Sequence, residues 1–333
     1  MSAISVQHLN KTFKTRRKAQ GLRGSLRGLI HPDEKTIEAV KDLSFEMEPG
    51  ELLGFIGPNG AGKSTTIKIL TGILFPTSGE VNVLGFTPWK ERSQLAYHIG
   101  TVFGQRPQLW YHLPAIDTFH LFGKIYDLPE KEVRSRIQFL AEAFEIVDLL
   151  ETPVRKLSLG QRMRCEVAAS LLHKPRLLLL DEPSIGLDVV AKQRIRDTVK
   201  QMNETENVGV LLTSHDAGDI EALCKRVIII NHGQIIYHDK VSTLKRNYLT
   251  SKLVEVRYAD EVSKDFQIIG TEVLKTGRYG VKLRFDTTKT PVEAVIKRLA
   301  DAGTLMDVTI SDPSLEEVIS RIYSPEHKPQ IGI

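Results

Sequence analysis

The chain has 333 residues, of which 41% are hydrophobic and 26% are charged, and its formal net charge is +4. This composition is near the globular average, so it excludes an intrinsically disordered chain, a collagen-like repeat and a small disulfide scaffold. No apolar run reaches the roughly 18–20 residues that a membrane-spanning helix needs, and the N-terminus lacks a secretory signal pattern. Cys165 and Cys224 lie far apart, which is typical of a reducing compartment and predicts no metal site between them. We therefore expect a soluble intracellular protein of about two domains.

The positive charge is concentrated near the N-terminus. Residues 14–36 carry seven basic side chains, namely Lys14, Arg16, Arg17, Lys18, Arg23, Arg27 and Lys35, against the acidic Asp33 and Glu34. Because a nucleic-acid binder usually spreads its basic residues over a whole face, we expect no nucleic-acid partner. Within this insertion Leu22, Leu26, Leu29 and Ile30 fall on one helical stripe. The segment is interpreted either as a solvated loop or as a peripheral contact with a membrane surface or a permease.

The first 245 residues show strands that alternate with helices. Strands are predicted at 4–9, 37–47 and 51–57, followed by a glycine-rich turn and a helix with Ile67, Leu70 and Leu74 on its apolar face, ended by Pro76. Residues 115–150 have a helical pattern. Apolar strands follow at 177–180, 208–213 and 227–230, and a hairpin turn leads into 234–237. This alternation predicts a mostly parallel sheet with crossover helices.

The pattern changes after about residue 245. Strands are predicted at 253–257, 279–285 and 306–310, an amphipathic helix at 291–300, and a last helix that begins after Asp312-Pro313. We therefore assign residues 1–245 to a first domain and 246–323 to a small α+β accessory domain. Residues 324–333 are expected to be a loose tail.

The strongest chemical motif is GPNGAGKS at residues 57–64, which matches GxxxxGK[ST] in full. Glycines let the backbone N–H groups of such a loop turn toward a phosphate, and the following helix adds its positive end. Lys63 is expected to neutralise the β- and γ-phosphates of a nucleotide, and the Ser64 hydroxyl to bind Mg²⁺. The predicted nucleotide-binding residues are Gly57, Pro58, Asn59, Gly60, Ala61, Gly62, Lys63, Ser64 and Thr65.

A second motif is the apolar run at residues 177–180, which ends in Asp181 and Glu182. Such a strand places two carboxylates at the edge of the sheet where α/β proteins bind their ligands. Asp181 is expected to hold Mg²⁺, and Glu182 to act as the general base that activates a water. Together with Lys63, these carboxylates predict a nucleoside triphosphatase site.

Residues 157–161, LSLGQ, resemble the LSGGQ signature of ABC transporter ATPases, and Gln161 lies 20 residues before Asp181. Leu159 stands in place of the second glycine, and Phe13 in place of a commoner tyrosine. The resemblance covers residues 1–240. It implies the ABC type of P-loop NTPase fold: an α/β protein with a mostly parallel core sheet, an antiparallel β subdomain and a helical signature subdomain at about 106–172.

The resemblance also implies roles for individual residues. Glu182, His215 and Gln105 would be catalytic, and Gln105 would join Ser64 and Asp181 at the metal. Phe13 would lie against the adenine, and 184–188 would form the D-loop, with Asp188. Ser158, Gly160 and Gln161 would contact the nucleotide of a second copy, which makes the expected assembly a homodimer that binds ATP and Mg²⁺.

The insertion, the single ATP-binding domain and the C-terminal appendage resemble subunits of bacterial drug and antibiotic exporters of the daunorubicin-resistance type. This resemblance implies a separate integral-membrane permease and a peripheral location on the cytoplasmic face of the bacterial inner membrane. Trp110 and Tyr111 are either core residues or part of the permease contact. Two alternatives remain open: the ATPase of an importer, and a regulatory ABC protein without transport. Glu182 and His215 favour a protein that turns ATP over.

Overall fold

The computed structural model describes residues 2–16, 34–104, 106–248, 251–263, 266–312 and 314–323. Most of the basic insertion, Gln105 and the C-terminal tail therefore lie outside the described residues. The chain divides into two compact units, Met1–Asp239 and Lys240–Ile333. Within the described ranges, no helix is both long and apolar enough to cross a membrane.

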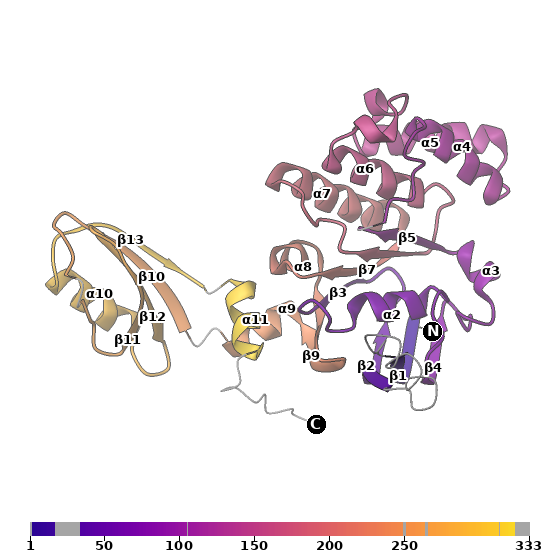
Figure 1. Cartoon of the computed structure of the whole chain (residues 1–333). Coiled ribbons are helices and arrows are strands. Elements are labelled where there is room, and N and C mark those ends of the chain that lie inside the picture. Colours follow the sequence, from indigo (N-terminus) through magenta and orange to yellow (C-terminus); the bar gives the residue numbers. More distant parts are fainter. Residues whose placement is uncertain are drawn as a thin grey trace, which may run out of the picture. The chain divides into compact units, whose positions relative to one another are not determined.

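The first unit is built on a six-stranded sheet in the order β5-β6-β7-β3-β8-β9. Its strands are β3 (Leu52–Ile56), β5 (Ile99–Phe103), β6 (Leu177–Asp181), β7 (Gly209–Ser214), β8 (Arg226–Asn231) and β9 (Gln234–Lys240). Every neighbouring pair from β5 to β8 is parallel. All residues of β6 and β7 are buried, as expected for a parallel sheet that is covered on both faces. The prediction of a mostly parallel core sheet is confirmed (Figure 1).

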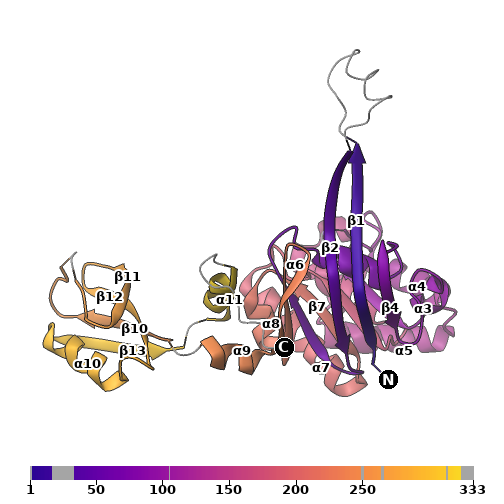
Figure 2. The same ribbon diagram turned by 90° about the horizontal axis from the view of Figure 1, so that it is seen from below.

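A three-stranded antiparallel sheet accompanies the core sheet. It consists of β1 (Ile4–Arg16), β2 (Glu34–Met47) and β4 (Ser78–Val83) in the order β2-β1-β4 (Figure 2). Its inward side chains, including Ile4 and Phe45, belong to the same buried cluster as Leu53 and Leu179 of the parallel sheet. The antiparallel β subdomain therefore shares one hydrophobic core with the parallel sheet.

Helices of the first unit cover the core sheet and form a separate helical part. They are α2 (Lys63–Leu70), α3 (Arg92–Ala96), α4 (Ala115–Ile125), α5 (Glu130–Ala143), α6 (Leu159–Ser170), α7 (Val189–Glu206) and α8 (Ala217–Leu223), with 3₁₀ turns η1 (Val147–Leu149) and η2 (Val154–Lys156). In Figure 1, α7 lies on one side of the sheet and α2 on the other. Helix α2 ends before Leu74, because Gly72 adopts a φ of +70°, the left-handed conformation that terminates many helices.

The second unit has its own sheet and core. Its elements are α9 (Val241–Tyr248), β10 (Ser251–Tyr258), β11 (Thr271–Thr276), β12 (Gly280–Asp286), α10 (Val292–Asp301), β13 (Leu305–Ser311) and α11 (Leu315–Tyr323). The strands are antiparallel in the order β11-β12-β10-β13. Val295 and Leu299 of α10 pack with Val254 and Leu283 of the sheet. The unit is thus an α+β domain, although α9 and β11 were not expected from the sequence.

Candidate active site

The phosphate-loop motif connects β3 to α2. Gly62 has a φ of +111°, and a Cβ atom there would lie 2.5 Å from the carbonyl oxygen of Ala39. Gly57 is equally constrained, because its Cβ would lie 2.5 Å from the carbonyl oxygen of Ile230. Pro58, Asn59 and Gly60 are exposed, and no side chain caps the N-terminus of α2. The loop therefore presents backbone N–H groups and the positive end of a helix, which together favour an anion.

Lys63 is buried at the start of α2 and connects the loop to the end of β6. Its Nζ donates to the carbonyl oxygens of Gly57, at 2.5 Å, and Pro58, at 3.3 Å. The same nitrogen lies 3.1 Å from Oε1 of Glu182, with which it forms an ion pair. All three partners are oxygens, so a phosphate would compete with them for the same ammonium group.

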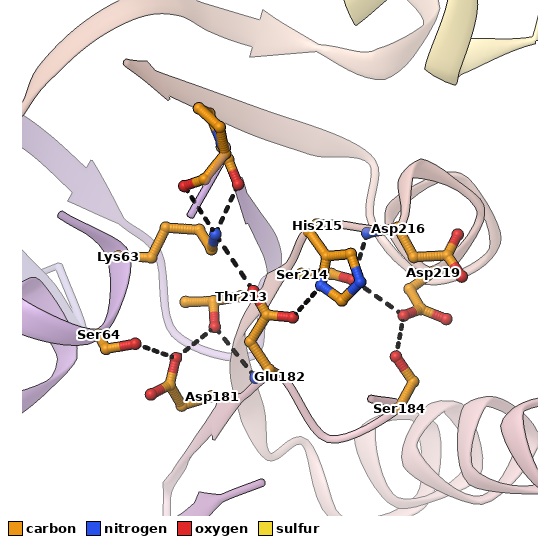
Figure 3. A network of polar contacts seen from close by, with 12 residues as sticks. Lys63, Ser64, Asp181, Glu182, Ser184, Thr213, Ser214, His215, Asp216 and Asp219 are labelled. Atoms are coloured by element: carbon orange, nitrogen blue, oxygen red, sulfur yellow. Dashed lines mark hydrogen bonds and ion pairs between the residues drawn. The ribbon is translucent and has the colours of Figure 1, made fainter. Parts of the chain in front are cut away.

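Asp181 lies beside Ser64 and Thr213 at the carboxyl ends of β6 and β7 (Figure 3). Its Oδ1 accepts hydrogen bonds from Ser64 Oγ at 3.1 Å and Thr213 Oγ1 at 2.7 Å. Ser64 and Asp181 also line a cavity of about 100 Å³, together with Lys68, Phe103, Arg106 and Glu182. Carboxylate and hydroxyl oxygens are the donors that Mg²⁺ prefers, so the residues present fit this ion.

Glu182 stands between Lys63 and His215. It follows β6 directly with a φ of +57°, and its backbone N–H donates to the carbonyl oxygen and Oγ1 of Thr213. One carboxylate oxygen faces Lys63, and the other contacts Nδ1 of His215. The Glu182 side chain is 10% exposed and that of His215 is 49% exposed. The carboxylate is thus held at a protected position, with the imidazole of His215 on its solvent side.

The predicted signature and D-loop residues form a second group, at the starts of α6 and α7. Ser158 is the N-cap of α6: its Oγ accepts from the backbone N–H of Gln161, and the Gln161 Oε1 accepts from the Ser158 N–H. Asp188 is the N-cap of α7, and its Oδ1 accepts from the N–H of Ala191 at 2.8 Å. A Cβ on Gly160 would lie 2.8 Å from the Cβ of Ala191, so the two helix starts touch.

Phe13 lies on β1 opposite Ile37 of β2, and Lys11 Nζ is 5.0 Å from its ring centroid. Strand β2 continues to Ala39, which borders Gly62, so the strand paired with Phe13 leads directly to the phosphate loop. Thr65 is half-buried within α2. Gln105 lies outside the described residues, so its predicted catalytic and metal-binding roles stay predictions.

Sequence reasoning missed the polar residues that connect this site. Thr213 joins Asp181 to the backbone of Glu182, and Ser214 and Asp219 form a neighbouring network with Ser184 of the predicted D-loop. The available signal was that two hydroxyl residues, Thr213 and Ser214, end an otherwise apolar strand. The pairing of β6 with β7 places Thr213 beside Asp181, and only the fold brings Ser214 to Asp219 of α8.

Comparison with known proteins identifies the family. A family model described as ABC transporter matches residues 40–185. The ABC transporter ATP-binding protein NatA of Bacillus subtilis is 33% identical over 63% of this chain and 85% of its own length. The linearmycin resistance ATP-binding protein LnrL of the same organism is 38% identical over 61% of this chain and 64% of its own length. A third B. subtilis relative, the uncharacterized ABC transporter ATP-binding protein YhcH, is 30% identical over 84% of this chain and 88% of its own length.

Solved structures agree with this assignment. CbiO1 of Clostridium perfringens, described as part of the ABC transporter complex cbiONQ, has a TM-score of 0.59 and 25% identity over 74% of this chain and 94% of its own. The dimeric ATP-binding cassette MJ0796 bound to ADP and Pi shares the fold, with a TM-score of 0.60 and 24% identity over 72% and 98%. This chain belongs to the ABC transporter family, as one of its ATP-hydrolysing ATP-binding proteins.

Proposed function

We propose that the chain is the motor subunit of an ABC exporter, in which two copies close around ATP and drive a separate membrane permease. The observation that carries this proposal is the cluster in which Glu182 contacts both Lys63 and His215, beside the bonded pair Asp181 and Ser64. Hydrolysis of a nucleoside triphosphate needs a cation that binds the phosphates, a carboxylate that activates water, and oxygen ligands for a metal ion.

Each residue of the cluster has a role in this proposal. Lys63 neutralises the phosphates. Glu182 accepts the proton of the attacking water as the water oxygen bonds to the γ-phosphorus and the bond from that phosphorus to the bridging oxygen breaks, so that ADP leaves with the bridging oxygen. His215 orients the Glu182 carboxylate and reaches the γ-phosphate from the solvent side. Ser64 and Asp181 would hold Mg²⁺, which supplies charge neutralisation at the β- and γ-phosphate oxygens. One carboxylate and one hydroxyl suit Mg²⁺, because this ion is usually bound through one or two carboxylates together with phosphate oxygens.

The site is proposed to be shared between two copies. Ser158, Gly160 and Gln161 form their own group at the start of α6, where Ser158 sits at an exposed helix N-terminus. We assign this helix start to the phosphates held by the partner copy, because N–H groups there favour anions. Dimerisation of a structurally similar cassette bound to ADP and Pi supports this arrangement.

Export and a peripheral location on the cytoplasmic face of the inner membrane rest on similarity and on one surface. LnrL, to which this chain is similar, is named as a linearmycin resistance protein, which supports removal of a drug-like compound. Trp110 and Tyr111 are 50% and 51% exposed, so they are surface residues that fit a permease contact. The basic segment at 14–36 would add contacts with anionic lipid.

The decisive variant is Glu182→Gln, which keeps the size of the side chain and removes the base. Hydrolysis should fall by about 10²–10⁴-fold while ATP binding is retained, because general-base catalysis typically contributes that factor. ATPase rates, nucleotide affinity and light scattering for an ATP-dependent dimer measure the three effects. Glu204→Gln, at an exposed position of α7, is the matched control and should behave as the wild type. A Glu182→Gln variant that hydrolyses ATP at the wild-type rate would refute the assignment.

A further inference from the structure

A buried carboxylate, Asp219, lies next to the hydrolysis cluster and belongs to none of the motifs described above. It is on α8 and only 2% exposed. Its Oδ2 accepts from Ser184 Oγ and from Ser214 Oγ, the latter at 3.0 Å (Figure 3). Its Oδ1 accepts from Arg196 Nε at 2.8 Å. Burying a carboxylate is costly unless it is paired, and here every contact is made by a cation or a hydroxyl donor.

Through the two serines, the Asp219 carboxylate contacts the chain next to each of the two proposed catalytic residues. Ser184 is two residues after Glu182, and Ser214 immediately precedes His215. Glu182 and His215 come from segments that follow two different strands, β6 and β7. One carboxylate oxygen of Asp219 thus holds the chain where it leaves β6 and where it leaves β7.

Ser214 also extends the network toward the backbone. Its Oγ accepts from the N–H of Asp216 at 2.9 Å while donating its own proton to Asp219. The backbone around His215 is therefore fixed on both sides, by Ser214 before it and Asp216 after it. Chains of hydrogen bonds such as this one strengthen one another in a buried environment.

Asp219 is not needed to begin α8. That task falls to Asp216, whose Oδ1 accepts from the N–H of Gly218 at 2.9 Å and which is the N-cap of the helix. Asp216 also pairs with Lys192. The two carboxylates of this helix turn therefore divide their contacts: Asp216 caps the helix, and Asp219 contacts the segments that carry Glu182 and His215.

We propose that Asp219 is a positioning residue for ATP hydrolysis, which holds Glu182 and His215 in register through Ser184 and Ser214. The inference rests on the proposed function, in which these two side chains act on ATP. Because Asp219 contacts neither Lys63 nor the phosphate loop, its loss should lower kcat and leave the KM for ATP within about twofold.

Three variants test this role. Asp219→Asn keeps the shape and replaces one acceptor by a donor, and we expect kcat to fall by about tenfold or more. Ser184→Ala and Ser214→Ala each remove one donor and keep the Asp219–Arg196 pair, and each should lower kcat by about fivefold. Asp197→Asn, at an exposed position of α7 where the side-chain oxygen still accepts from Gln193, is the matched control and should keep kcat and KM. Melting temperatures establish that each variant is folded.

The outcomes separate this inference from the function on which it rests. If Glu182→Gln hydrolyses ATP normally, the proposed function is wrong. If Glu182→Gln is inactive but folded Asp219→Asn retains kcat within twofold, the positioning role alone is refuted. A rise in KM that equals the loss of kcat would also refute it, because it would indicate general disruption. Should Asp219→Asn fail to fold, the two serine variants decide by the same criteria.

Discussion

A buried glutamate in the signature helix should make the first unit less stable as the pH rises. Glu166 lies on α6 and is 1% exposed, and its Oε1 has no hydrogen-bond partner within the described residues. Arg162 Nε is 3.4 Å from that oxygen. Burial raises the pKa of Glu166 from 4.5 to about 7, against the opposing effects of Arg162 and of the backbone N–H of Gln108.

The sign follows from proton binding. Between pH 4.5 and 7 the folded chain keeps a proton on Glu166 that the unfolded chain has released. The free energy of unfolding therefore falls as the pH rises through this range, by about 1.4 kcal/mol per pH unit, or about 3 kcal/mol in total. Above pH 7 the whole penalty is present, and below pH 4.5 it is absent.

Glu166→Gln removes this titration. Its stability relative to the wild type should increase by about 2 kcal/mol between pH 5.5 and pH 8.5. Urea unfolding followed by tryptophan fluorescence is a suitable assay, because the two tryptophans, Trp89 and Trp110, both belong to the first unit. ¹³C NMR of the carboxyl group gives the pKa directly.

The matched control is Glu151→Gln, which changes an exposed glutamate of the same unit. Its stability difference from the wild type should not vary over the same pH range beyond a few tenths of a kcal/mol. Parallel pH profiles for wild type and Glu166→Gln, or a Glu166 carboxyl that titrates near pH 4.5, would refute the reasoning.

Two further predictions concern assembly. Lys63→Ala should weaken ATP binding, because it removes the positive charge that faces the phosphates. Ser158→Arg should block the ATP site of the partner copy. A mixture of the two variants pairs both defects at one site and leaves the other whole, so light scattering should detect partial recovery of the ATP-dependent dimer; no recovery would contradict the shared site. A second change replaces Arg16, Arg17, Arg23 and Arg27 by Gln. It should preserve ATPase activity but reduce co-sedimentation with permease-containing membranes at low salt, since each basic residue contributes about 1 kcal/mol near an anionic surface. Membrane association that is unchanged across salt concentrations would contradict this role for Arg16, Arg17, Arg23 and Arg27.

The core sheet could be predicted from the sequence because its strands are continuous apolar runs. Residues 177–180 are all leucine, and only a strand that is buried on both faces tolerates such a run. The phosphate loop was equally clear, because positive φ angles and close backbone approach require glycine at fixed positions. These signals are local, so one sequence suffices to find them.

Features that depend on contacts between distant segments could not be predicted. Asp219 and Ser184 are 35 residues apart in sequence, and nothing in either segment indicates that they touch. The end of α2 was misplaced because the apolar period continues to Leu74, although Gly72 carried the stop signal. Helix α9 and strand β11 have only eight and six residues, too few for a periodicity to be distinctive.

Because Ser158 forms the capping box of α6, the same side chain affects both the stability of this helix and the proposed recognition of a nucleotide. A serine hydroxyl has lone pairs and one hydrogen, and Ser158 uses a lone pair to accept from Gln161. In the proposed dimer its hydrogen would donate to a phosphate oxygen held by the partner copy, so one side chain would both cap its own helix and bind a nucleotide. Alanine would forfeit both functions, at a cost of about 1 kcal/mol for the cap alone, whereas threonine preserves both and glycine sacrifices mainly the donor. A series of these three residues at position 158 would therefore resolve the two contributions that a single substitution confounds.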